Sequence, residues 1–120
     1  MMRPMTIYKP FDVVVVPFPF TDKASVKRRP ALVLSSDKTF NIQAEHSVLA
    51  MITSAQNSSW PLDANIEDLA AAGLSASSIV RMKLFTLDER LILRKVGELS
   101  NADKQTVEAS LQQLLPSLKN

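Results

Sequence analysis

Three basic residues in a row, Lys27, Arg28 and Arg29, stand directly before a proline and the apolar run that follows it. Residues 1–30 contain six basic and two acidic residues, a balance of +4, so with a net charge of +2 the other 90 residues carry −2. Cations gathered around one loop attract a polyanion even when the whole chain is nearly neutral. A loop that is merely solvated has the same composition and is the structural alternative.

The composition fits one compact domain over residues 1–120, of which 46% are hydrophobic. The chain has no cysteine, so disulfides and thiolate metal sites are excluded. Its apolar runs are far shorter than the roughly 20 residues that span a bilayer, and its first residues lack the pattern of a signal peptide. We therefore expect a cytoplasmic protein that has no membrane contact, bound metal or cofactor.

Five runs rich in β-branched and aromatic residues predict the strands of one sheet: 11–20, 30–36, 46–54, 77–85 and 92–99. Pro17 and Pro19 cannot donate ladder hydrogen bonds and should end the first strand or turn it out at an edge. Gly97 indicates a bulge or a sharp bend. Residues 86–91 indicate a turn or a single helical turn.

Two helices complete the expected fold. The first is short, about two turns, with Asn65 as its cap and Gly73 closing it. The second begins at Ser100, which has capping-box spacing with Asp103, and one apolar face is formed by Val107, Leu111, Leu114, Leu115 and Leu118. The fold class is therefore mainly β with helices (α+β), a small bent antiparallel sheet or barrel with the last helix packed on it.

Several segments, in order, resemble the MazF/PemK family of toxin endoribonucleases: DVVVVPFPFTD, KRRPALVLSS, LAMITS, PLD and SSIVRMKLFTLDERLILRKVGELS. The similarity runs from about Asp12 to Ser100. It implies an SH3-like barrel that dimerises and a toxin that cleaves single-stranded RNA without metal. It also implies neutralisation by a cognate antitoxin protein, with DNA bound only indirectly through that complex.

The resemblance also implies which residues act. Arg29, immediately before the proline that opens the second strand, matches the catalytic arginine of the family. Thr53, in the Ile-Thr pair at the end of the third strand, matches its catalytic threonine. We expect further RNA contacts from four residues near these two: Lys27, Arg28, Ser54 and Lys83.

The expected chemistry needs few groups, because RNA carries its own nucleophile in the 2′-hydroxyl. The planar fork of an arginine meets two phosphate oxygens at once, and a threonine hydroxyl can donate to the same oxyanion. A guanidinium, with a pKa above ~12, is a poor base, so electrostatic stabilisation is the firmer role for Arg29 and the base stays open. The structural alternative for Arg29 is an ion pair with Asp22 or Asp37.

Other conspicuous residues have structural explanations. His46 is the only histidine, but strand alternation sends it to the face opposite Thr53, roughly 23 Å away at ~3.3 Å per residue. Trp60 could stack on a base, and we favour instead a place over the core or in a dimer interface. Asp12 and Asp88 are expected to form hydrogen bonds at a turn and at a strand end.

The chain departs from the family pattern at two positions. Phe11 stands where the family commonly has glycine, which touches the local turn. Met82 follows Arg81 where the family often has an acidic or amide residue, which bears on the RNA contacts of that edge. A non-catalytic SH3-like module that binds nucleic acid or antitoxin, including a degenerate toxin, is therefore the alternative. We expect the loop 21–28 to lie over the cleft and bring positive charge to the RNA.

Overall fold

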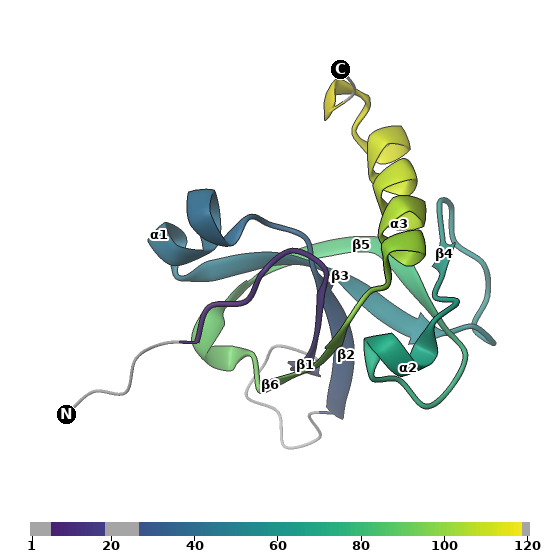
Figure 1. Ribbon diagram of the computed structural model, residues 1–120, viewed down its shortest axis with the longest axis horizontal. Coiled ribbons are helices and arrows are strands. Elements are labelled where there is room, and N and C mark those ends of the chain that lie inside the picture. The colour runs from purple at the N-terminus through teal and green to yellow at the C-terminus, as the bar shows by residue number, and fades with distance from the viewer. Residues whose placement is uncertain (1–5, 19–26, 119–120) are drawn as a thin grey trace.

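The computed structural model describes residues 6–18 and 27–118, and within them one antiparallel sheet of six strands forms the centre of the fold (Figure 1). Its strands follow the order β4-β5-β3-β2-β1-β6. They are β1 (Asp12–Phe18), β2 (Lys27–Val33), β3 (His46–Ser54), β4 (Ala64–Asn65), β5 (Ser78–Asp88) and β6 (Arg94–Glu98). The sheet curls into a half-barrel, which confirms the predicted SH3-like antiparallel fold.

Short helical segments decorate this sheet, and one longer helix ends the described chain (Figure 1). A π-helical turn at Asp37–Asn41 leads into α1 (Ile42–Ala44), and α2 (Leu69–Ala72) follows β4. A 3₁₀ turn at Glu89–Leu91 joins β5 to β6, and α3 (Asn101–Leu114) is followed by a last 3₁₀ turn at Pro116–Leu118. In this part of the chain, every helix is shorter or more polar than a bilayer crossing requires.

Both faces of the central strands are covered, which explains their continuous apolar runs. On one face, Val13, Leu32 and Ile52 belong to a core cluster that Val107 of α3 also joins. On the concave face, Val14 and Leu49 belong to a second cluster. Because successive residues of a strand alternate between the faces, each strand contributes to both clusters, and only its ends are left to face solvent.

The short strand β4 was not predicted, and several boundaries of the predicted strands are shifted. Pro17 does not end β1 but pairs with Arg28 of β2. β6 follows β1 only as far as Val15, so Pro17 lies at an edge, which is the second of the two predicted outcomes. β2 begins at Lys27, so the basic residues belong to the strand itself. β5 continues to Asp88, and only the second half of 86–91 forms a helical turn.

The first predicted helix was misplaced. Asn65 does not cap it, because Asn65 pairs with Ile79 as part of β4. The cap is Asp68, whose carboxylate accepts a hydrogen bond from the Ala71 backbone N–H at 3.0 Å. Gly73 ends α2 with a φ of 73°, as predicted for a closing glycine.

The last helix follows its prediction except at its two ends. Ser100 caps it by accepting from the Asp103 backbone N–H at 3.2 Å, but the Asp103 carboxylate does not complete a capping box. Its two oxygens instead accept from the backbone N–H groups of Glu67 and Asp68, each at 3.0 Å. The predicted apolar face stops at Leu114, because Leu115 and the following Leu118 are exposed.

Two backbone positions bear on the site. A bulge in the β1–β6 pairing lies at Gly97, as predicted, and a Cβ there would collide with backbone atoms of Ala71 and Ala72 in α2. Phe11 has a φ of 72°, a region in which non-glycine residues are strained by ~1–2 kcal/mol. This first departure from the family pattern does fall on the local turn, where its ring packs against the core.

Candidate active site

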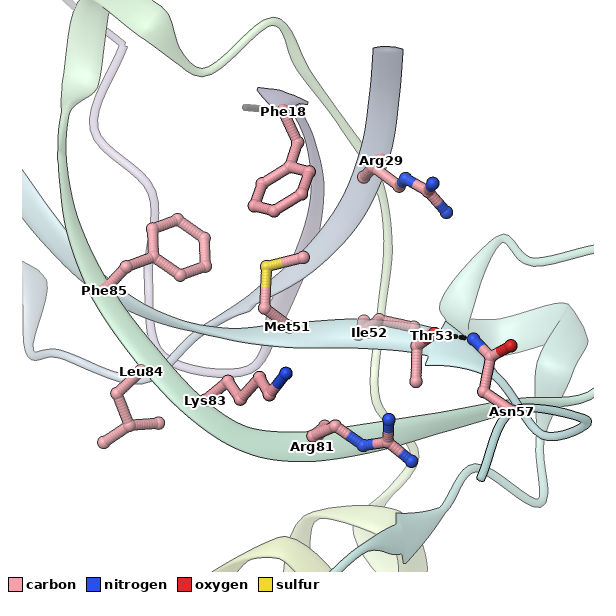
Figure 2. Close-up of a pocket in the computed structure, with 10 residues that line it drawn as sticks. All are labelled: Phe18, Arg29, Met51, Ile52, Thr53, Asn57, Arg81, Lys83, Leu84 and Phe85. Atoms are coloured by element: carbon pink, nitrogen blue, oxygen red, sulfur yellow. Dashed lines mark hydrogen bonds between the residues drawn. The ribbon is translucent and has the colours of Figure 1, made fainter. Parts of the chain in front are cut away.

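A pocket of about 440 Å³ opens on the concave side of the sheet, where the ends of β1, β2, β3 and β5 meet (Figure 2). Apolar and cationic side chains share its lining. The residues are Phe18, Arg29, Met51, Ile52, Thr53, Asn57, Arg81, Lys83, Leu84 and Phe85. A pocket of this composition can hold a ligand that is both flat and anionic.

Strand register places the two predicted catalytic residues together. Ala31 of β2 pairs with Met51 of β3 in an antiparallel ladder. Arg29 and Thr53 lie two residues beyond that pair on their strands, so alternation puts both on the face of Ala31 and Met51. Figure 2 shows them on neighbouring strands at one end of the pocket, which both of them line. Both side chains therefore border the same cavity.

The hydroxyl of Thr53 is oriented by a neighbouring amide. The side-chain amide of Asn57 donates a hydrogen bond to Thr53 Oγ1 at 2.5 Å (Figure 2). A hydroxyl has one donor hydrogen and two acceptor lone pairs. Since Asn57 occupies an acceptor position, the O–H of Thr53 remains available to donate toward a ligand.

Arg81 fastens the loop that carries Asn57. Its guanidinium donates to both carboxylate oxygens of Asp63, at 3.1 and 3.0 Å, and to the Ser58 carbonyl at 2.5 Å. The hydrogen bond to Asp63 raises the pKa of Arg81 above its already high ordinary value. No sequence pattern pointed to Asn57, which lies in a polar loop, and Arg81 could be suspected only as a basic residue on a predicted strand.

Lys83 and Trp60 form a cation–π contact next to the pocket. The Lys83 ammonium lies 4.5 Å from the centre of the Trp60 ring. Trp60 is 43% exposed, so the prediction that it covers the core was wrong, while a place in a dimer interface stays a prediction. Lys83 is one of the four predicted RNA-binding residues, and it does line the pocket.

The other three predicted RNA-binding residues lie outside this pocket. Lys27, the first residue of β2, is exposed and pairs with Phe18 of β1. Arg28 lines a second cleft. Ser54 is exposed and accepts a hydrogen bond from the Gln56 backbone N–H at 3.2 Å. Their contacts with RNA stay predictions.

Several residues for which the sequence predicted no catalytic role lie away from the pocket. His46 contacts the Ala44 carbonyl at 2.9 Å through Nδ1 and pairs with Asp88 at the far end of β3. Asp12 accepts from the Lys9 backbone N–H at 2.9 Å, as expected for a turn. Met82 is 8% exposed and belongs to a core cluster, and its bearing on the RNA contacts of that edge stays a prediction.

Two further observations concern charge. Among the described residues, Arg29 forms no salt bridge, with Asp37 or any other acidic side chain, while Asp22 lies outside them. Most of the loop 21–28 also lies outside the described residues, which include only Lys27 and Arg28 of it. Nowhere in 6–18 or 27–118 do three or more metal-ligating His, Asp or Glu side chains gather.

Comparison with known proteins identifies the family and the fold. The family model described as PemK-like, MazF-like toxin of type II toxin-antitoxin system matches residues 9–115. Among curated protein sequences, none matches significantly.

Solved structures share the fold at low identity. A MazE–MazF crystal structure from Deinococcus radiodurans has a TM-score of 0.73 at 21% identity, covering 92% of this chain and 98% of that one. An endoribonuclease from a mycobacterial species has a TM-score of 0.71 at 14% identity, covering 95% and 96%. Toxin MazF-mt6 of Mycobacterium tuberculosis has a TM-score of 0.68 at 16% identity, covering 85% and 93%.

Proposed function

The chain belongs to the PemK-like, MazF-like toxin family of type II toxin–antitoxin systems, and we propose that it is an endoribonuclease that cuts single-stranded RNA. In this proposal it acts in the cytoplasm, selects its cleavage sequence, needs no metal and arrests growth when no antitoxin is bound. The observation that carries the proposal is the shared pocket: Arg29 and Thr53 line it from neighbouring strands, on the same face.

The reaction is an internal displacement at phosphorus. The 2′-hydroxyl loses its proton as its oxygen bonds to phosphorus, the bond to the 5′-oxygen breaks, and that oxygen takes up a proton. The products are a 2′,3′-cyclic phosphate and a 5′-hydroxyl end. Arg29 lacks an ion pair among the described residues, so its charge is available to the phosphate oxygens that become more negative in the transition state.

Thr53 has the second role at the phosphate. With Asn57 donating to its oxygen, the Thr53 O–H points its hydrogen toward the same non-bridging oxygen that Arg29 meets. A preorganised donor of this kind stabilises the transition state without reorganising during the reaction. Arg81 is already engaged with Asp63, so in the proposal it holds the surrounding loop and contributes charge only through the field.

The apolar part of the pocket supports a role in binding bases and partners. Phe18 and Leu84 are 37% and 39% exposed beside the cations. Unpaired RNA bases stack on such surfaces, and a segment of antitoxin that is both apolar and acidic would compete for the same place. We expect the active form to be a homodimer, with RNA in a groove at the interface.

Cleavage mapping tests the proposal. Purified protein is incubated with a long RNA in the presence of EDTA, and the cut ends are located and chemically identified. We expect cuts at a defined sequence with 5′-hydroxyl and cyclic phosphate ends, and growth arrest on expression that Arg29→Ala relieves. Intact RNA together with tight binding of an acidic antitoxin would instead establish the non-catalytic, degenerate toxin and overturn the nuclease.

A further inference from the structure

A second cleft, of about 420 Å³, lies on the other side of β2 from the pocket. Its walls come from β1, β2 and β6, from the turn that follows α2 and from the start of β5. Its charged residues are Arg28, Arg29 and Arg94, and its polar residues include Ser75 and Ser78. Within the described chain, no acidic residue lines this cleft.

Strand register sets Arg28 and Arg94 on one face. Arg94 of β6 pairs with Val15 of β1, and Arg28 of β2 pairs with Pro17, two residues further along β1. Residues two apart on a strand share a face, so the two arginines flank β1 on the same side. They lie two strands apart across the sheet and two residues apart along it, which places their Cα atoms roughly 12 Å from each other.

The three arginines of the cleft differ from the other two that the structure describes. Arg81 pairs with Asp63 at 3.0 Å, and Arg90 pairs with Asp88 at 2.8 Å. Arg28, Arg29 and Arg94 form no salt bridge within the described chain, which leaves three positive charges around one cavity. Such a concentration of unpaired charge creates a field that favours a polyanion.

We propose that this cleft holds the sugar–phosphate backbone of the RNA strand on one side of the scissile bond, without reading its bases. The inference rests on the proposed function, which supplies the strand. Arg29 lines both cavities, so a strand that leaves the pocket passes directly to Arg28 and Arg94. The cleft has none of the exposed large hydrophobic residues that the described chain presents elsewhere, and so offers no aromatic ring for base stacking and no apolar anchor for a protein partner.

The test measures binding of oligonucleotides whose sugars carry 2′-fluorine and which therefore cannot be cut by their own 2′-oxygen. Probes of about 20 and about 5 nucleotides are compared, since single-strand sites commonly cover roughly 4–16 nucleotides. The variants are Arg28→Gln and Arg94→Gln. Arg90→Gln is the matched control, because it removes the same charge from an exposed arginine whose partner is Asp88. Thermal melting checks that each variant is folded.

We expect Arg28→Gln and Arg94→Gln together to weaken binding of the long probe about 10-fold. The slope of log affinity against log salt should fall by about 0.7 for each lost phosphate contact. The short probe and Arg90→Gln should change little. Methylphosphonate linkages, which are uncharged, are then placed on one flank of the long probe. On one of the two flanks they should abolish the difference in affinity between the variants and the wild type, whatever the base sequence of the probe.

The inference is overturned if Arg28→Gln and Arg94→Gln weaken binding of both probe lengths equally, or if Arg90→Gln weakens binding as much. It is also overturned if the variants still bind more weakly than the wild type whichever flank carries the neutral linkages. Weakened binding of poly-glutamate with unchanged binding of the long probe would also overturn it, in favour of an acidic protein partner. Cleavage of a short natural RNA by the wild type is measured in parallel. Failure there rejects the proposed nuclease, whereas the binding data judge the cleft by themselves.

Discussion

The two ends of the β3–β5 ladder contain similar polar residues and use them differently. At one end, Arg90 pairs with Asp88 at 2.8 Å, and the Ser47 hydroxyl donates to Glu89. At the other end, the Thr53 hydroxyl accepts a hydrogen bond from the Asn57 amide, and Arg29 on the adjoining strand forms no salt bridge with described residues. At the first end the arginine has a carboxylate partner within the chain, although one buried oxygen of Glu89 there has no hydrogen bond among the described residues. At the second end, Arg29 has no acidic partner among the described residues.

The largest effect is expected from removing the unpaired charge. Arg29→Ala should lower the rate of RNA cleavage about 1000-fold, because the phosphate loses its main electrostatic partner. Arg90→Ala, at the paired end of the ladder, is the control and should leave the rate unchanged. The measurement is single-turnover cleavage of a labelled RNA in EDTA, and equal rates for Arg29→Ala and the wild type would remove Arg29 from the mechanism.

The next effect comes from the hydroxyl. Thr53→Val keeps the shape of the side chain and removes its donor, so cleavage should fall about 100-fold while the melting temperature stays the same. Thr86→Val makes the same change at an exposed position of β5 toward the paired end. If both variants cleave like the wild type, Thr53 is not a donor to the phosphate.

A smaller effect is expected from the group that orients that hydroxyl. Asn57→Ala should lower kcat about 10-fold, the equivalent of one hydrogen bond, with little change in KM. Asn57→Asp should lower kcat further, because a carboxylate accepts the proton of Thr53 and repels the phosphate. A lower activity of Asn57→Ala than of Asn57→Asp would contradict this positioning role.

Two carboxyl groups at the Arg90–Asp88 end of the ladder should make the stability of the protein depend on pH. The hydrogen bond from Arg90 lowers the pKa of Asp88 from 3.8 to about 2, so its stabilising contribution is present above pH 3.8 and is lost as the pH falls toward 2. Burial raises the pKa of the adjacent Glu89 above 4.5, so stability falls as the pH rises from 4.5 through the pKa of the folded state.

Carbon-13 titration of the two carboxyl groups by NMR measures these shifts directly. Arg90→Ala should bring the pKa of Asp88 back up and leave Glu89 above its ordinary value, because its largest cause is burial. Two carboxyl groups that titrate together would show that the turn is open to water in solution.

The sheet could be predicted from the sequence because its strands are built from apolar runs whose periodicity is strong. The buried faces of β1 to β3, and Val107 of α3, follow directly from those patterns. The turn at 37–41 and α1 were missed because they depend on a distant contact: the buried Asn41 amide donates to the Tyr8 carbonyl at 2.9 Å. Asn65 was taken for a helix cap because local preference cannot register its pairing with Ile79.

The site was only partly predictable. The resemblance to the family pointed to Arg29 and Thr53, and strand register then placed them on one face. The division of the basic run between two cavities could not be foreseen, since it requires knowing that the strand already begins at Lys27. Asn57 was missed because its contact with Thr53 depends on the path of a loop, which no periodic pattern records.

The buried carboxylate of Asp103 has a consequence for how the molecule opens. By accepting from the backbone N–H groups of Glu67 and Asp68, it ties the first turn of the terminal helix to the segment before α2, which in turn packs its backbone against Gly97. These three pieces, distant in the chain, should unfold as one cooperative unit. Hydrogen–deuterium exchange should therefore show the amides of Glu67 and Asp68 as protected as those inside the helix, and Asp103→Ala should release all of them together.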